Sequence, residues 1–528
     1  MNKNQIKKLV ALALLATAPF MSFAQKEKAN WQNLDLKTDS VFGISTEKAY
    51  TELLKGKKST PVIVGVLDGG VDYLHEDLKR VMWVNKKEIA NNGKDDDKNG
   101  FIDDIHGWNF VGGKEGSVNY ETLELTRLVR RDSKRFANTT VQNVAEKDRA
   151  AFEAYLKNKE TLERDLETAK SGLEGATRVK NLIDDLVKKV GKDNPTVEEL
   201  RAYTPSGQTE TNIRNNVIRN MGKGDFKTFY EERIKGAYDY YYNQVNYNLN
   251  LNYDPRGIVG DNPDNSNEKN YGNNDVKGPD ASHGTHVAGI IGADRTNNLG
   301  IKGVADNVLI LAVRNVPNGD ERDKDVANAI RYAVDNGAKV LNMSFGKAYS
   351  WDKKVVDDAV KYAVSKDVLL VHAAGNDNKD LDVENNFPTN KYLDGGVASS
   401  WITVGASTPT DNQNLKAGFS NYGKTTVDVF APGYNIYSTY PEQQYKDENG
   451  TSMASPVVAG LAALIRSYYP KLTAAQVKEI IMKSVEKVNH NVTVIKDGKA
   501  ESVPFADLSV SGGVVNTYNA LKLAATYK

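Results

Sequence analysis

The sequence contains no cysteine among its 528 residues. Disulfide bonds therefore cannot stabilise the fold, although an exported protein would be free to form them. A lipid-modified N-terminal cysteine is excluded for the same reason. We expect stability to come from core packing, with a bound metal ion as a candidate contributor.

An excess of charge of either sign is also missing, because 69 basic side chains balance 69 acidic ones. Proteins that bind nucleic acid or an anionic membrane through their charge carry a basic excess. We therefore expect no nucleic-acid partner. A content of 40% apolar and 26% charged residues instead suits a soluble globular protein.

Near the N-terminus, the apolar stretch Leu9–Ala18 spans only ten residues, about half of what a transmembrane helix needs. Lys3, Lys7 and Lys8 precede it, and Ser22-Phe23-Ala24 follows as a fitting cleavage site. This arrangement predicts a secretory signal peptide over residues 1–24, in preference to a buried helix of the mature fold. The mature chain would then lack a transmembrane segment and act in the periplasm or outside the cell.

Short apolar runs of strand-forming residues recur from residue 62 onward. They are apolar on both faces, which is typical of parallel strands covered by helices. Helical patterns at Val326–Asp335 and Lys354–Val364 lie between some of them. The alternation predicts an α/β fold with a doubly wound, mostly parallel sheet flanked by helices. The predicted strands are Val62–Leu67, Val308–Val313, Lys339–Met343, Val368–Ala373, Trp401–Gly405 and Val427–Phe430.

Residues 107–275 interrupt this pattern and are predicted to form a mainly α-helical insertion. Apolar residues there recur at helical spacing, and Thr196-Val-Glu-Glu199 is typical of a helix capping box. The predicted organisation is a signal peptide (1–24), a short N-terminal segment (25–59), two parts of one α/β domain (60–106 and 276–528) and the insertion (107–275).

Three residues stand where such a fold places reacting groups. Asp68 follows the first strand, at the edge where functional groups of open α/β sheets gather. His283 lies where a loop leads into an apolar helical run, and Ser452 precedes the nearly all-apolar stretch Ala454–Ile465. A serine hydroxyl is a weak nucleophile and needs a base. An imidazole can take its proton near neutral pH, and a carboxylate orients the imidazole.

The motifs around these residues resemble those of the subtilases, the subtilisin-like serine peptidases. They are Val66-Leu-Asp-Gly-Gly-Val-Asp72, His283-Gly-Thr-His-Val-Ala-Gly289 and Gly450-Thr-Ser-Met-Ala-Ser-Pro456, supported by Asn342-Met-Ser-Phe-Gly346, Ala373-Ala-Gly-Asn376 and Ala431-Pro-Gly433. The resemblance covers residues of roughly 60–106 and 276–525. It implies a serine endopeptidase that hydrolyses proteins or peptides through an acyl-enzyme, without a catalytic cofactor.

The resemblance also implies roles for residues outside the triad. Asn376 would complete the oxyanion hole together with the backbone N–H of Ser452. The primary specificity pocket would be lined by Ser344, Phe345, Gly346, Ala374 and Gly375, whose backbones would pair with an extended peptide.

Alternative interpretations remain for several of these residues. Asp72 competes with Asp68 but is interpreted as a loop-stabilising acid, and Ser455 competes with Ser452 but is expected to face the core. His286 and His372 are interpreted as structural, although His283 and His286 have a spacing that metal pairs use. Two other functions also stay open: an inactive, protein-binding relative, and an esterase, for which the second glycine of the nucleophile elbow is missing.

The run Asp95-Asp-Asp-Lys-Asn-Gly-Phe-Ile-Asp-Asp104 has oxygen ligands at alternate positions followed by a glycine. This resembles the first half of a calcium loop. We predict a structural calcium site from Asp95, Asp97, Asn99 and Asp103, with Asp104 as an alternative to Asp103. The competing interpretation is a solvated acidic turn.

One departure from the family pattern concerns the carboxylate itself. Gly69 follows Asp68 where subtilases usually have serine or threonine. The hydroxyl that would help to orient Asp68 is missing, so we expect other groups to perform this task.

Overall fold

The computed structural model describes residues 29–222, 224–496 and 498–527. The predicted signal peptide, residues 1–24, lies outside the described residues. Within the described part of the chain, no helix is long and apolar enough to cross a membrane. The described residues divide into two compact units, one formed by residues 29–124 and 254–527 and the other by residues 125–253.

The larger unit contains a nine-stranded sheet of order β12-β15-β9-β8-β7-β6-β1-β5-β2, and only β12 runs antiparallel to its neighbour. Its strands are β1 (Val62–Asp68), β2 (Gly107–Asn109), β5 (Val308–Arg314), β6 (Val340–Met343), β7 (Leu369–Ala373), β8 (Trp401–Ser407), β9 (Val429–Pro432), β12 (Glu486–Lys487) and β15 (Gly513–Val514). The predicted mostly parallel α/β fold is confirmed.

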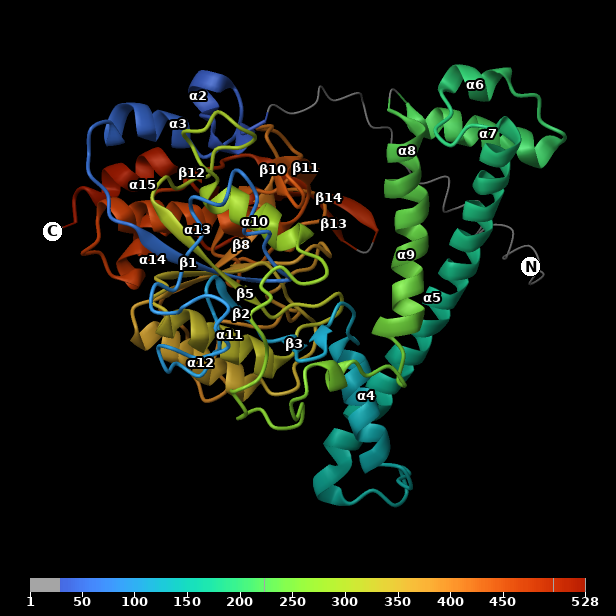
Figure 1. Ribbon diagram of the computed structural model, residues 1–528, viewed down its shortest axis with the longest axis horizontal. Helices are drawn as coiled ribbons and strands as arrows, with labels where there is room; N and C mark the ends of the chain where they lie inside the picture. Colours follow the sequence, from blue (N-terminus) through green and yellow to red (C-terminus); the bar gives the residue numbers. More distant parts are fainter. Residues whose placement is uncertain (1–28, 223, 497, 528) are drawn as a thin grey trace. The chain divides into compact units, whose positions relative to one another are not determined.

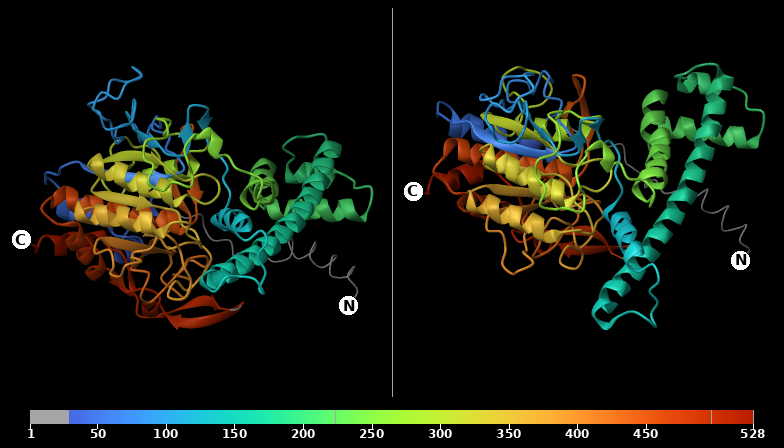
Figure 2. Two further views of the ribbon diagram at one scale, coloured as in Figure 1. Left: turned by 90° about the horizontal axis from the view of Figure 1, so that it is seen from below. Right: turned by 60° about the horizontal axis from the view of Figure 1, so that its bottom comes forward.

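Helices cover both faces of this sheet (Figures 1 and 2). One core cluster joins one face of the strands to α10 (Ser282–Gly292) and α13 (Thr451–Tyr468). A second joins the opposite face to α11 (Asp323–Asp335) and α12 (Lys353–Ser365). The other described α-helices of this unit are α2 (Leu36–Asp39), α3 (Thr46–Ala49), α14 (Ala474–Lys483) and α15 (Thr517–Ala524). Three two-stranded sheets complete the unit: β3 (Gly112–Gly113) with β4 (Gly116–Ser117), β10 (Ile436–Tyr440) with β11 (Gln444–Glu448), and β13 (Asn491–Lys496) with β14 (Lys499–Pro504).

The N-terminal segment is built into the larger unit. Trp31 is 1% exposed, and its Nε1 donates to the carbonyl of Asn435 at 3.1 Å. Ile44 and Ala49 lie in the same core cluster as α13. Burial of these apolar side chains fixes residues 31–54 to the α/β unit.

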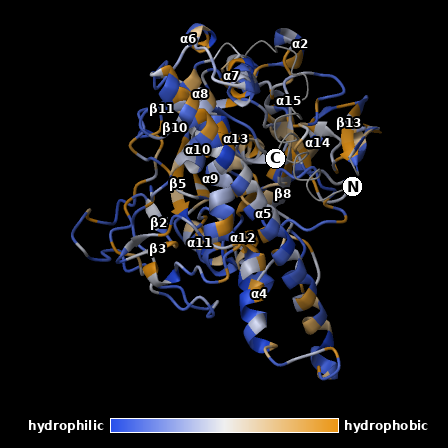
Figure 3. Cartoon of the chain, turned by 90° about the vertical axis from the view of Figure 1, so that its right-hand side faces the viewer, coloured by the Kyte–Doolittle hydropathy of each residue, from blue (hydrophilic) through white to orange (hydrophobic). Residues whose placement is uncertain are grey.

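The smaller unit is helical and has its own apolar core. Its helices are α4 (Glu124–Arg135), α5 (Arg149–Val190), α6 (Val197–Ala202), α7 (Gln208–Met221), α8 (Phe226–Phe229) and α9 (Gly236–Asn243). The ribbon of α5 carries both hydrophobic and hydrophilic residues (Figure 3), as expected for a helix that buries one face. Thr196 and Glu199 form the predicted capping box of α6.

Candidate active site

Asp68 and His283 meet at the carboxyl end of β1. Nδ1 of His283 lies 2.8 Å from Oδ1 and 3.0 Å from Oδ2 of Asp68. The Asp68 side chain is 3% exposed and that of His283 is 43% exposed, so the ring edge stays open. Because Nδ1 faces the carboxylate, Nε2 is the nitrogen left to accept a proton.

A glycine permits this close approach. A Cβ added to Gly284, the residue after His283, would lie 2.2 Å from the carbonyl oxygen of Gly70 and 3.1 Å from the Cβ of Asp68. Only a residue without a side chain lets the start of α10 lie against the loop that follows β1.

The charges around His283 favour its protonated form. Surrounding protein atoms lower the pKa of His283 by desolvation, but the charge of Asp68 and its hydrogen bond raise the pKa more. Glu448 and Asp280 add smaller effects of the same sign. The pKa of His283 is therefore above its ordinary value of 6.5.

Ser452 is the second residue of α13, so its hydroxyl lies at the positive end of the helix dipole. Its Oγ donates to the carbonyl of Ser344 at 3.2 Å, and Oγ of Ser344 donates back to the carbonyl of Ser452 at 2.9 Å. The described residues show no hydrogen bond between Ser452 and His283. Ser344 lies near both residues. It is hydrogen-bonded to Ser452, and it lines a cavity of about 240 Å³ together with Asp68 and His283.

The two competitors predicted to be structural have other partners. Ser455 is fully buried, and its hydroxyl donates to Oδ1 of Asn342 at 2.8 Å. Asp72 accepts from Nζ of Lys277 at 3.0 Å and from the backbone N–H of Glu442 at 3.2 Å. Desolvation raises the pKa of Asp72, but these hydrogen bonds outweigh it and the net pKa is lowered. Asp72 thus holds the loop together in ionised form.

The side chain of Asn376 points its oxygen toward the start of α13. Oδ1 accepts from the backbone N–H of Thr451 at 2.8 Å and from its hydroxyl at 3.0 Å. Nδ2 has no hydrogen-bond partner among the described residues, and it lies 3.4 Å from the position that a Cβ on Gly450 would take. The amide therefore offers a donor beside Ser452.

The residues predicted to line the specificity pocket have different surroundings. Ser344 bonds Ser452, whereas the Phe345 ring packs in the second core cluster and its carbonyl accepts from Nε2 of His372 at 2.8 Å. Asn386, which the sequence did not point to, donates to the carbonyls of Ala373 and Ala374 at 3.1 and 3.0 Å. Its Oδ1 lies 2.3 Å from where a Cβ on Gly346 would stand. Gly375, at a φ of +99°, lies beside Asn421 and Asn386.

Two buried histidines, His286 and His372, are neutral. Burial lowers the pKa of His286 to about 3 and that of His372 to about 4. The Nε2 atom of His286 lies 3.0 Å from the carbonyl oxygen of Lys446, in the middle of β11.

A family model described as the subtilase family matches residues 59–499. This chain is a subtilase. It is 40% identical over 222 residues to "Thermophilic serine proteinase" from Bacillus sp. (strain AK1). The aligned segment covers 42% of this chain and 51% of that protein. It is 38% identical over 221 residues to "Thermitase" from Thermoactinomyces vulgaris, covering 42% and 73%. It is 40% identical over 197 residues to "Subtilisin DY" from Bacillus licheniformis, covering 37% and 67%. The match thus spans about half the length of the first of these relatives.

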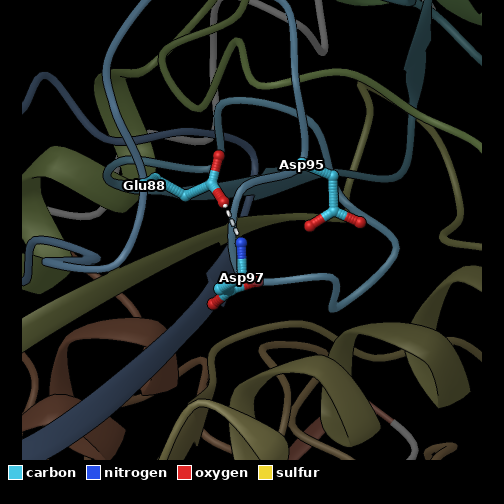
Figure 4. Close-up of side chains that lie close together, drawn as sticks. All are labelled: Glu88, Asp95 and Asp97. Carbon is cyan, nitrogen blue, oxygen red and sulfur yellow. Dashed lines mark hydrogen bonds between the residues drawn. The ribbon is translucent and has the colours of Figure 1, made fainter.

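Between β1 and β2, the chain of this subtilase brings three carboxylates together. Carboxylate oxygens of Glu88, Asp95 and Asp97 lie within 4.8 Å of one another (Figure 4). Glu88 is 8% exposed, and its Oε1 accepts the backbone N–H groups of Asp96 and Asp97 at 2.8 and 3.0 Å. No lysine or arginine in the described part of the chain lies within 4.0 Å of these carboxylates.

Three residues of the predicted calcium loop, Asp103, Asn99 and Asp104, lie outside this group of three carboxylates. Both carboxylate oxygens of Asp103 accept backbone N–H groups, those of Asn92 and Gly93, at 3.1 and 2.9 Å. Asn99 donates to Asp104 at 3.0 Å, and its own oxygen accepts from the N–H of Phe101. Burial raises the pKa of Asp104 to about 6, and this carboxyl accepts from Tyr332 at 2.7 Å. Glu88, which was not predicted, completes the group with Asp95 and Asp97. It lies outside the acidic run, so the spacing within that run could not reveal it.

Proposed function

We propose that this subtilase is a serine endopeptidase in which Ser452, His283 and Asp68 form the catalytic triad. The observation that carries the proposal is the pair of hydrogen-bond distances between Nδ1 of His283 and Asp68. With Nδ1 held by the carboxylate, Nε2 faces outward as a base. The family match and relatives named as proteinases and subtilisins support the same activity.

In the reaction, Oγ of Ser452 attacks the carbonyl carbon of the scissile peptide while Nε2 of His283 takes the hydroxyl proton. The carbonyl oxygen becomes an oxyanion. Nδ2 of Asn376 and the backbone N–H of Ser452 donate hydrogen bonds to it. As the C–N bond breaks, His283 returns the proton to the departing amine. Water then hydrolyses the acyl ester of Ser452 through the same base.

The substrate would lie as an extended strand between segments 344–346 and 374–376. Both segments follow strands of the main sheet, β6 and β7, so their backbones sit on a rigid base. Cleavage of casein and of a peptide library tests the activity. We expect wild-type cleavage and none by Ser452→Ala. Binding of peptides without cleavage would favour the non-catalytic relative, and cleavage of esters alone would favour an esterase.

We also propose export through residues 1–24. A relative named "Minor extracellular protease Epr" from Bacillus subtilis (strain 168), 37% identical over 207 residues, supports this location. N-terminal sequencing of the protein recovered outside the cytoplasm tests it, with a start shortly after Ala24 expected.

A structural calcium ion held by Glu88, Asp95 and Asp97 is the third proposal for this chain. The three carboxylates have no basic partner within 4.0 Å among the described residues, so a cation would relieve their repulsion. Carboxylate oxygens are the ligands that calcium prefers. Further ligands would have to come from backbone carbonyls or water.

A further inference from the structure

The carboxylate of Asp68 depends on its neighbour for its orientation. Oδ1 of Asp68 accepts the backbone N–H of Gly69 at 2.7 Å and also faces His283. Gly69 carries no side chain that could lock this peptide. The Asp68 carbonyl of this peptide accepts the backbone N–H groups of Asn315 and Val316 at 3.0 and 3.3 Å. The carboxylate also depends on what holds the other side of Gly69, its carbonyl group.

Arg314 provides that contact. It is the last residue of β5 and lies opposite Asp68 in the parallel pairing of β1 with β5. Its Nε donates to the carbonyl of Gly69 at 2.6 Å, and its Nη2 donates to the carbonyl of Val118 at 2.6 Å. A fork held at two points fixes the direction of the guanidinium, and a charged donor makes these hydrogen bonds stronger than neutral ones.

The environment of Arg314 is unusual for a buried charge. The residue is 1% exposed, yet no carboxylate in the described part of the chain lies within 4.0 Å of it. Its acceptors are neutral: backbone carbonyls and, at 3.2 Å, Oδ1 of Asn109. Desolvation lowers the pKa of Arg314 to about 10, although the charges of Asp275 and Asp280 raise it. A buried cation with no carboxylate in direct contact is costly, so a fold that merely needed packing here would be better served by an apolar side chain.

A second glycine, Gly278, leaves room for the guanidinium because it has no side chain. Gly278 has a φ of +64°, and a Cβ added there would lie 2.2 Å from Nε of Arg314. Arg314 also lines the cavity that contains Asp68 and His283. The guanidinium is therefore confined directly beside the catalytic pair.

We propose that Arg314 is a positioning residue that fixes the backbone of Gly69 at its carbonyl group. Through the N–H of the same residue, it also fixes the Asp68 carboxylate that orients His283. It performs the task expected of the hydroxyl that Gly69 lacks. The inference rests on the proposed peptidase function, because an oriented Asp68 matters only if His283 acts as the base.

The first test is Arg314→Lys, which keeps the charge but cannot reproduce the two-point fork. We expect kcat to fall by about tenfold to a hundredfold with KM nearly unchanged, because misplacing a catalytic group by about 1 Å has an effect of this order. The low-pH limb of kcat/KM should also move to lower pH, because a displaced Asp68 raises the pKa of His283 less. Charges on Glu448 and Asp280, the other groups that raise this pKa, are unchanged in the variant.

The matched control is Arg295→Lys. Arg295 is also largely buried, with 8% of its side chain exposed, and it donates to the carbonyl of Gly303 at 2.6 Å, away from the triad. This control should lose stability without moving kcat per active site or the pH limb. Active-site titration with a phosphonate corrects every rate for the folded fraction.

Gly278→Ala is a second variant that keeps the arginine and displaces its guanidinium. It should show the same loss of kcat and the same shift of the pH limb, and it decides the matter if Arg314→Lys does not fold. The inference is overturned if the folded variants match wild type in kcat per active site and in pH profile. If wild type itself neither cleaves peptides nor reacts with the phosphonate, the proposed function has failed instead.

Discussion

Oδ1 of Asn376 accepts both the backbone N–H and the hydroxyl of Thr451, at 2.8 and 3.0 Å. Of the two terminal atoms of the carboxamide, only the oxygen can accept from a backbone N–H. This contact therefore decides which way the carboxamide points. The Nδ2 donor is thereby turned toward Gly450 and the start of α13. A residue beside the nucleophile thus fixes the direction of the donor that would stabilise the oxyanion.

Replacing this donor tests its role. We expect Asn376→Ala to lower kcat by about 10²- to 10³-fold with little change in KM, the magnitude known for the corresponding asparagine of subtilisin. Steady-state kinetics on a peptide substrate measures both values. A large rise in KM with unchanged kcat would instead assign Asn376 to ground-state binding.

The raised pKa of His283 predicts the acidic limb of the pH profile. The base must be neutral to accept the proton of Ser452, so kcat/KM should rise with pH, with a midpoint above 6.5. Asp68→Asn removes the negative charge that raises this pKa. The midpoint should then move to lower pH, and kcat should fall by about 10⁴-fold. A midpoint that does not move in this variant would mean that Asp68 does not act on His283.

Gly284 tests the close approach of α10 to the loop after β1. Gly284→Ala places a Cβ 2.2 Å from the carbonyl oxygen of Gly70, so the two segments must separate. We expect a loss of about 1–3 kcal/mol in unfolding free energy, together with lower kcat per active site. Gly418→Ala is the control, because nothing lies within 4 Å of a Cβ added there. Equal stability and activity of the two variants would contradict the packing argument.

Calcium binding is tested by thermal unfolding with and without a chelator. We expect calcium to raise the Tm of the wild-type protein, because a ligand that binds only the folded state stabilises it by mass action. Glu88→Gln should reduce the difference in Tm between the two conditions. Asp96→Asn changes a neighbouring carboxylate outside the group of three and should leave the difference intact. A calcium effect of the same size in all three proteins would place the ion elsewhere.

The sequence predicted most of the main sheet because buried parallel strands are continuous apolar runs. It did not predict β2, whose three residues Gly107–Asn109 are too few to form such a run and pair only at the edge next to β5. Residues 107–124 and 254–275 were assigned to the insertion for this reason, whereas the helical unit comprises only residues 125–253. The apolar stripes of the insertion were visible, but not that they share one helix, α5.

The candidate catalytic residues were visible because each lies in a short motif. Arg314 was not, because its contact with Gly69 joins residues that are distant in the sequence. Asn386 and Glu88 contact residues closer in the sequence, Ala374 and Asp97, but neither lies in a motif that points to its role. For Asp103 the sequence shows the spacing but not the hydrogen bonds, and its role as a ligand stays a prediction. Its spacing suits a ligand, but its φ of +53° belongs to a turn in which its carboxylate accepts the N–H groups of Asn92 and Gly93.

The most direct test of the account is to map the site of phosphonate labelling by mass spectrometry. We expect a single label on Ser452, a labelling rate that falls as His283 becomes protonated, and no label on Ser452→Ala. Ser467→Ala, whose hydroxyl bonds within α13, should be labelled like wild type. A label on Ser455, or labelling that persists in Ser452→Ala, would contradict the assignment of Ser452 as the nucleophile.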